Sequence, residues 1–328
     1  MKYRKLGKTN FEVSEISLGT WQVGGGWGGT FDHATASQII HTALDQGINF
    51  IDTADVYDNG LSEAAVGKAI KKRSERIYVA TKCGKHINPH INENYHPEAL
   101  RKYVEASLKN MGLETLDLIQ LHCPPTEVYR RDEIFELFDR LKEEGKIQNL
   151  GVSVEQISEA LAAMDYDNVT TVQLIFNMFR LKPSESFFKA AAEKNIGIIV
   201  RVPLASGLLA GKLTKDSSFD PEDHRTFNRD GAAFDKGETF SGVPFELGLE
   251  AVELLKKVFD GSENLAAWAL RWILMFPEVS TIIPGASKVS QVLGNVNASS
   301  LPAITPEKMN EVKRIYDQYI RQYVHHQW

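Results

Sequence analysis

The chain has 328 residues, of which 43% are hydrophobic and 24% are charged. This ordinary globular composition excludes a disordered, collagen-like or coiled-coil chain. The formal net charge of −6 disfavours nucleic acid or an anionic membrane surface as the main partner.

The two cysteines, Cys83 and Cys123, cannot build a disulfide framework, which indicates a reduced, cytoplasmic location. The N-terminal sequence MKYRKLGKTNFEV has no apolar stretch typical of a signal peptide. No uninterrupted apolar run approaches the roughly 18 residues that a membrane span requires. We therefore expect a cytoplasmic protein without a membrane-spanning segment.

Eight short, largely apolar runs predict strands. They are residues 16–21, 48–54, 77–83, 116–123, 147–153, 171–177, 197–203 and 279–285. Runs without polar alternation are typical of strands buried on both faces in a parallel sheet. Ahead of the first run, alternation within residues 2–16 predicts a β-hairpin that closes the floor of the fold.

Amphipathic segments separate these strands and predict helices. They span residues 33–47, 61–72, 97–111, 133–144, 156–164, 183–194, 263–276 and 288–297. Several end in the glycine of a helix-to-strand turn, as at Gly112 and Gly145. Eight strand–helix units predict one (β/α)8 TIM barrel domain over residues 1–328, and the alternative is an open, doubly wound sheet.

Two segments depart from the regular alternation of strands and helices. The interval between the seventh and eighth strands is unusually long, with a polar, glycine-rich segment at 214–244 and a predicted helix at 245–258. A further helix is expected at 305–324. A long loop at the carboxyl ends of barrel strands is typical of a lid, and the alternative is a disordered insertion.

Four chemically active side chains gather at the expected ends of three neighbouring strands, where barrel active sites lie. Asp52 lies near the end of the second strand and Tyr57 follows it, Lys82 ends the third, and His122 ends the fourth. A Lys ammonium beside a Tyr lowers the pKa of the phenol, a carboxylate keeps the Lys charged, and a neutral His can orient a substrate oxygen. The group suits protonation of an oxygen on which negative charge develops, as in carbonyl reduction.

Seven segments together resemble the aldo-keto reductase family. They are residues 3–21, 47–70, 79–82, 116–122, 147–153, 203–213 and 282–295, of which DTADVYDNGLSE at 52–63 is the most specific. The resemblance implies an NADPH-dependent oxidoreductase that reduces aldehydes, with ketones and sugar carbonyls as further candidates. Asp52, Tyr57, Lys82 and His122 would be the catalytic tetrad, with Tyr57 as the general acid, and no metal is expected.

The resemblance also implies a set of NADP(H) contacts. Thr20, Trp21, Asp52, Ser153, Gln173 and Arg201 would surround the nicotinamide end. Leu204, Ala205, Gly207, Leu208 and Lys212 would run under the pyrophosphate. Ser287 and Lys288 would bind the 2′-phosphate near a helix N-terminus, and Gln291 and Asn295 would face the adenine.

Three positions depart from the family pattern. Val154 replaces a frequent Asn, Gln291 replaces a frequent basic residue, and Arg201 stands where many members stack a Tyr on the nicotinamide. The planar guanidinium of Arg201 can stack as well, or it can reach a phosphate. Trp21, Trp27 and Phe179 are the candidates for the apolar lining of the substrate pocket.

Two other function classes are weaker readings of this sequence. Some relatives of the fold act as channel-associated regulatory subunits that bind the cofactor and turn over slowly, and the tetrad is present in both classes. Hydrolase chemistry is disfavoured, because the first strand lacks the His-x-His pattern of metal-dependent barrel hydrolases. We expect a small-molecule carbonyl substrate as the partner, and the oligomeric state is left open.

Overall fold

The structure, a computed structural model, describes residues 1–25, 30–261 and 263–328. Its main sheet has eight parallel strands in the order β10-β9-β8-β7-β6-β5-β4-β3. The strands are β3 Leu18–Gly19, β4 Phe50–Asp52, β5 Tyr78–Cys83, β6 Leu116–His122, β7 Ile147–Ser153, β8 Val169–Ile175, β9 Gly197–Arg201 and β10 Val279–Ile282. All eight fall within the predicted runs or overlap them.

The sheet closes on itself into a barrel, which confirms the predicted (β/α)8 fold. Parallel bridges join Ile16 to Ile282 and Gly19 to Gly285, and the Ser17 amide donates to the Ile282 carbonyl at 2.8 Å. The open-sheet alternative is therefore wrong. Closure leaves no unpaired edge and turns one face of every strand toward the lumen.

The N-terminal hairpin pairs β1 Tyr3–Lys5 with β2 Glu12–Ser14 in antiparallel register. Its apolar side chains pack into one end of the lumen, as predicted. The hairpin region supplies Leu6, Phe11 and Val13, and the barrel supplies Phe50, Ala80, Leu118, Ile199 and Ile283. This small core seals the amino-terminal end of the barrel.

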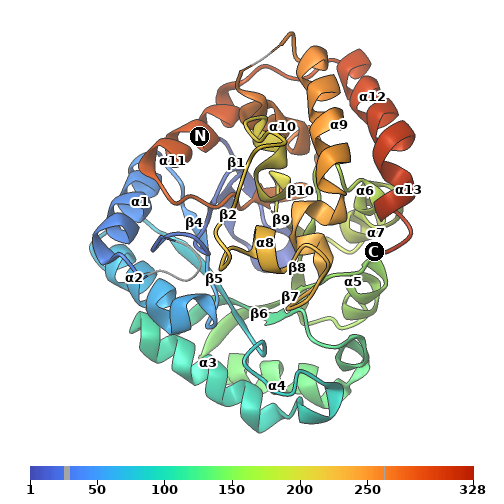
Figure 1. Ribbon diagram of the computed structural model, residues 1–328. Coiled ribbons are helices and arrows are strands. Elements are labelled where there is room, and N and C mark those ends of the chain that lie inside the picture. Colours follow the sequence, from blue (N-terminus) through green and yellow to red (C-terminus); the bar gives the residue numbers. More distant parts are fainter. Residues whose placement is uncertain (26–29, 262) are drawn as a thin grey trace.

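Helices surround the strands on the outside (Figure 1). They are α1 His33–Asp45, α2 Leu61–Ile70, α3 Pro97–Met111, α4 Asp132–Glu143, α5 Ile157–Ala163, α6 Lys182–Ser186, α7 Phe188–Glu193, α9 Phe245–Val258, α10 Leu265–Ile273 and α11 Val289–Asn297. The main hydrophobic core lies between their inner faces and the outer face of the sheet. Asp32 caps α1 by accepting from the Ala34 and Thr35 amides, which fixes where the first helix begins.

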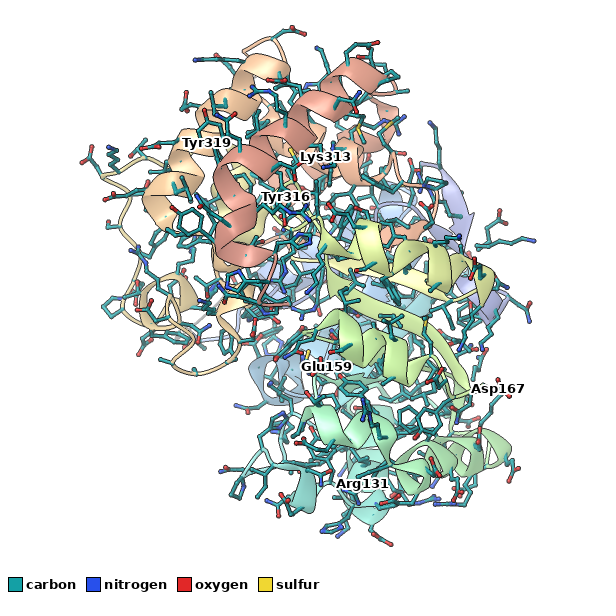
Figure 2. All side chains as sticks on the ribbon, turned by 90° about the vertical axis from the view of Figure 1, so that its right-hand side faces the viewer. Arg131, Glu159, Asp167, Lys313, Tyr316 and Tyr319 are labelled. Atoms are coloured by element: carbon teal, nitrogen blue, oxygen red, sulfur yellow. The ribbon has the colours of Figure 1, made fainter. Side chains whose placement is uncertain are left out.

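Two predicted helices are interrupted. The segment 183–194 forms α6 and α7, which meet at Phe187, where the backbone is non-helical with φ −123° and ψ −42°. The C-terminal segment forms α12 Pro306–Ile315, a π-helical turn at Tyr316–Ile320, and α13 Arg321–Val324. Figure 2 shows this C-terminal helix, with Lys313 and Tyr316, on the outside of the barrel beside α9.

The long segment before α9 folds onto the barrel mouth. It contains the short helix α8 His224–Phe227, which lies over the centre of the barrel in Figure 1, and two single turns at Lys236–Glu238 and Phe240–Gly242. His224 contacts Trp21 and Ser206, both from loops at the carboxyl ends of the strands. The predicted alternative of a disordered insertion is therefore wrong for this segment. Within the described residues, no helix combines the length and apolar character needed to cross a membrane.

Candidate active site

Inward-facing side chains form two layers in the barrel, because side chains alternate between the two faces of a strand. The lower, apolar layer contains Phe50, Ala80, Leu118 and Ile199. Two residues further along the same four strands come Asp52, Lys82, Gln120 and Arg201. The period of two therefore places a polar, buried layer directly above the apolar floor, at the carboxyl ends of the strands.

Lys82 and Asp52 form a buried ion pair in this polar layer. Lys82 Nζ lies 2.5 Å from Asp52 Oδ1, with side chains that are 1% and 2% exposed. Lys82 also donates to the Thr53 carbonyl at 2.8 Å. The second oxygen of Asp52 accepts from the amides of Gln120 at 3.1 Å and Gln173 at 2.8 Å. The carboxylate is thus held on both oxygens, which fixes the position of the ammonium.

Tyr57 comes to this pair from the loop after β4. Its hydroxyl lies 3.3 Å from Lys82 Nζ. The following turn, Tyr57–Gly60, places Asp58 and Asn59 in the left-handed region with φ of 48° and 52°, a conformation that Asp and Asn tolerate better than most residues. The turn directs the phenol back over the barrel mouth, where its ring lies 6.1 Å from that of His122.

The charges at the site favour a protonated Tyr57 beside a charged Lys82. Burial is the largest single influence and disfavours the ammonium, but Asp52 and Tyr57 together outweigh it and raise the pKa of Lys82 above its ordinary value. Burial also raises the pKa of Tyr57, and Lys82 opposes this rise without cancelling it. The predicted direction of the Lys82 effect is confirmed, whereas the predicted net lowering of the Tyr57 pKa is wrong, because desolvation of the phenol is the larger effect.

His122 faces the mouth as a neutral imidazole. Burial, together with the positive charges of Lys82 and Lys85, holds the pKa of His122 well below its ordinary value. Its Nδ1 is buried and has no hydrogen-bond partner among the described residues. A neutral imidazole can offer a hydrogen bond to a substrate oxygen without adding charge.

Three predicted nicotinamide neighbours are buried near the tetrad. Thr20 donates to the Asp52 carbonyl at 3.1 Å and accepts from Ser62, so its side chain holds β3 against β4. Ser153 is opposite Gln173 in the β7–β8 register, and Gln173 donates to Asp52. The side chains of Ser153 and Gln173 thus lie next to each other at the mouth, while the side chain of Thr20 stabilises the pairing of β3 with β4.

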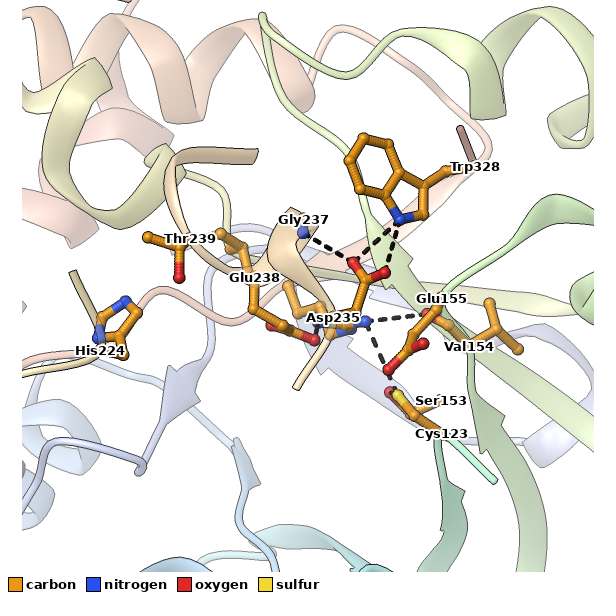
Figure 3. Close-up of polar contacts among 12 residues, drawn as sticks. Cys123, Ser153, Val154, Glu155, His224, Asp235, Gly237, Glu238, Thr239 and Trp328 are labelled. Atoms are coloured by element: carbon orange, nitrogen blue, oxygen red, sulfur yellow. Dashed lines mark hydrogen bonds and ion pairs between the residues drawn. The ribbon is translucent and has the colours of Figure 1, made fainter. Parts of the chain in front are cut away.

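Arg201 forms an ion pair that could not be predicted from the sequence. Its guanidinium contacts the carboxylate of Glu238, from the turn Lys236–Glu238. It also donates to the Val154 carbonyl at 2.9 Å and lies 3.8 Å from Cys123 Sγ. Figure 3 draws the contacts to Val154 and Cys123 as dashed lines. The guanidinium of Arg201 is therefore buried at the mouth in contact with a carboxylate.

The predicted pyrophosphate loop is a tight turn, Ala205–Ala210. Ala205, Ser206 and Gly207 have φ of 47°, 53° and 98°, so three consecutive residues are left-handed. Leu204 and Gly207 are half-buried, Leu208 is buried, and Lys212 is exposed. The amides of Ala205 and Gly207 donate to the Val202 and Leu204 carbonyls at 3.1 and 3.0 Å, so the turn is fixed by its own hydrogen bonds.

The predicted adenosine end lies at the start of α11. The Ser287 and Lys288 amides donate to Gln291 Oε1 at 2.7 and 3.1 Å. Gln291 thus caps the helix through its side-chain carbonyl oxygen. Asn295 is largely buried and donates to the Gly285 carbonyl at 3.5 Å. The exposed Lys288 side chain remains available beside this helix N-terminus.

The predicted pocket residues have different surroundings. The Trp21 ring stacks 6.2 Å from Tyr57 and also contacts His224 and Phe234 at 5.2 and 6.3 Å. Phe179 is 1% exposed in the main core. Trp27 lies outside the described residues. An aromatic wall next to Tyr57 is therefore built by Trp21 together with the 214–244 segment.

Sequence reasoning missed two residues of this site, Gln120 and Glu238. Gln120 has a visible signal, because it lies two positions before His122 on the same strand face. Glu238 has none, since its segment has no periodicity from which a contact with β9 follows. The residues at the mouth fit a nicotinamide cofactor: Nδ1 of His122 and Nε of Arg201 are buried without partners among the described residues.

A barrel whose mouth joins Asp52, Lys82, Tyr57 and His122 defines a candidate oxidoreductase site. Residues 15–317 match the model of the Aldo/keto reductase family, and the chain belongs to this family. Its members are oxidoreductases that use nicotinamide cofactors. The resemblance expected from the sequence is thereby confirmed.

Similar proteins include aldo-keto reductases and a probable channel subunit. The chain is 34% identical over 298 residues to "Aldo-keto reductase YhdN" of Bacillus subtilis, covering 89% of this chain and 87% of the relative. It is 29% identical to a "Probable voltage-gated potassium channel subunit beta" of Arabidopsis thaliana, covering 96% of each. The solved glycerol dehydrogenase AKR11B4 from Gluconobacter oxydans is 30% identical with a TM-score of 0.79, covering 97% of this chain and 96% of that one.

Proposed function

We propose that this protein is an NADPH-dependent reductase that converts aldehydes to alcohols in the cytoplasm, with ketones and sugar carbonyls as further substrate classes. The observation that carries the proposal is the hydrogen-bonded series from Asp52 through Lys82 to the Tyr57 hydroxyl, at 2.5 and 3.3 Å. When bound, the reduced nicotinamide supplies the hydride that reduces the carbonyl carbon.

Tyr57 acts as the general acid. Burial keeps its hydroxyl protonated near neutral pH, so a proton is present where the carbonyl oxygen gains negative charge. As the proton leaves, the phenolate that forms lies beside the ammonium of Lys82, which stabilises it. Asp52 keeps Lys82 charged and in place, and the neutral His122 donates a hydrogen bond that orients the carbonyl oxygen.

The cofactor contacts follow the barrel mouth. Ser153 and Gln173 hold the carboxamide end, since an amide side chain offers both a donor and an acceptor. The left-handed turn at Ala205–Gly207 lies under the pyrophosphate. Lys288 provides the charge for the 2′-phosphate at the start of α11, which favours NADPH over NADH.

The experiment is a titration with NADPH and NADH that follows tryptophan fluorescence, and then an assay of small aldehydes in the same cuvette. We expect NADPH to quench the fluorescence, and each active aldehyde to remove the 340 nm absorbance over many turnovers. Failure to bind either nucleotide would overturn the cofactor assignment.

A cofactor-binding regulatory subunit is the second candidate, because a probable channel subunit is among the similar proteins. The tetrad does not separate the two functions. Tight NADPH binding with less than one turnover per site across the aldehyde panel would favour the regulatory function.

A further inference from the structure

The positive charge of Arg201 lies across the barrel mouth. The residue ends β9 and is opposite Ile175 of β8 in the register. Its guanidinium nevertheless donates to Val154 and approaches Cys123, the residues that directly follow the ends of β7 and β6. The charge thus extends from β9 past the end of β8, over the level at which Ser153 and Gln173 lie.

This charge is removed from solvent together with the carboxylate of Glu238, and Glu155 is a second acidic residue that acts on it. The Arg201 side chain is 10% exposed and that of Glu238 is 14% exposed. A buried charge requires a compensating partner, because desolvation otherwise costs several kcal/mol. Glu238 provides this partner, while Nε of Arg201 is left without one among the described residues.

Glu238 is held in place by the turn that carries it. Ser206 Oγ donates to the Glu238 carbonyl at 2.9 Å. Asp235 caps the turn by accepting from the Gly237 amide at 2.7 Å, and its carboxylate accepts from Trp328 Nε1 at 2.9 and 3.0 Å. Figure 3 shows the dashed contacts that join Asp235 to Gly237 and to Trp328. The carboxylate therefore has a fixed position at the mouth.

Both charges act on the catalytic groups. Arg201 contributes to lowering the pKa of His122, and Glu238 contributes to raising the pKa of Tyr57. The pair is consequently close enough to influence any charge that develops between these two residues.

We propose that Arg201 and Glu238 set the relative affinity of the protein for the oxidised and reduced nicotinamide, an inference that rests on the proposed function. The dihydronicotinamide ring is neutral, and loss of a hydride leaves a ring with one positive charge. The guanidinium of Arg201 repels the positively charged ring, and the carboxylate of Glu238 offsets this repulsion. The sign of the net charge at the mouth thus decides which redox form binds more tightly.

The test measures the dissociation constants of NADPH and NADP⁺ by fluorescence titration of the full chain. In Glu238→Gln the guanidinium loses its ion-pair partner and weakens NADP⁺ selectively, so the ratio of Kd for NADP⁺ to Kd for NADPH rises roughly tenfold, the order of effect of one unit charge at about 10 Å with an effective dielectric constant near 20. In Arg201→Met the unpaired carboxylate lowers the same ratio. The double variant returns the ratio toward the wild-type value.

The matched control is Asp230→Asn, which removes an exposed carboxylate of the same segment. We expect its ratio to change less than twofold. The electrostatic effect changes the ratio of dissociation constants in opposite directions in the two single variants. A general loss of order in the segment would not produce opposite changes. Unchanged ratios in Glu238→Gln and Arg201→Met, with both nucleotides still bound, would overturn the inference. A wild-type protein that binds neither nucleotide would instead overturn the proposed function.

Discussion

The Lys82 ammonium and the Asp52 carboxylate meet at 2.5 Å in a part of the barrel where both side chains are almost completely removed from solvent. Asp52 of β4 is opposite Ala80 of β5 in the register, and Lys82 lies two residues further along β5. The pairing of Lys82 with Asp52 positions the ammonium within hydrogen-bond distance of Tyr57. The ion pair therefore stabilises the polar layer, and it also positions the ammonium whose charge acts to lower the pKa of the Tyr57 phenol.

Replacement of Asp52 by Asn is expected to destabilise the protein by about 3–5 kcal/mol, because it leaves a buried ammonium without a charged partner. Urea unfolding at pH 7 measures this loss. The control is Asp45→Asn, which breaks the exposed Arg73–Asp45 pair and should cost less than about 1 kcal/mol. Equal losses in the two variants would contradict the structural role of the buried pair.

Asp55 makes stability dependent on pH in a defined direction. Burial, reinforced by the nearby Glu63, raises the pKa of Asp55 to about 7, and both its oxygens lack hydrogen-bond partners among the described residues. Since the folded state holds this proton more tightly than the unfolded state does, Asp55 costs stability progressively as the pH rises from about 4 to 7.

Replacing Asp55 by Asn should therefore stabilise the protein more at pH 8 than at pH 5, by about 2–3 kcal/mol. The free energy of unfolding at the two pH values measures the difference. Asp139→Asn, at an exposed position on α4, is the control and should show no such dependence. A pH-independent effect of Asp55→Asn would show that the folded-state pKa of Asp55 is not raised.

The barrel and its polar layer are largely predictable from the sequence, because both depend on local patterns. Apolar runs mark strands with two buried faces. The alternation along the strands of Phe50 with Asp52 and Ala80 with Lys82 places each polar residue above an apolar one. The hairpin floor follows from the same period of two in residues 2–16.

The remaining features depend on contacts between distant segments, which local patterns do not encode. Glu238 meets Arg201 only because the 214–244 segment folds across the mouth. The predicted effect of Lys82 on Tyr57 had the right sign, yet desolvation outweighs it, and desolvation depends on the whole closed mouth. The sequence has no proline or glycine at Phe187 from which the interruption of the helix could be predicted.

Lys288 is the residue on which the predicted preference for NADPH depends most, since Gln291 is occupied by capping α11. Lys288→Ala should weaken NADPH binding about fivefold, as expected for one exposed charge contact, and leave NADH binding unchanged. Fluorescence titrations with both nucleotides measure this. Lys189→Ala, on the distant helix α7, should alter neither. A parallel loss for NADH would mean that Lys288 does not recognise the 2′-phosphate.

Tyr57→Phe tests the central claim most directly, because it removes one hydroxyl and keeps the ring that stacks near Trp21. Single-turnover reduction of a small aldehyde by the variant, measured beside the NADPH dissociation constant, separates chemistry from binding. We predict that the rate of hydride transfer falls by about 10²–10⁴-fold while the dissociation constant changes less than about twofold. A variant that retains a near wild-type rate would contradict the assignment of Tyr57 as the general acid.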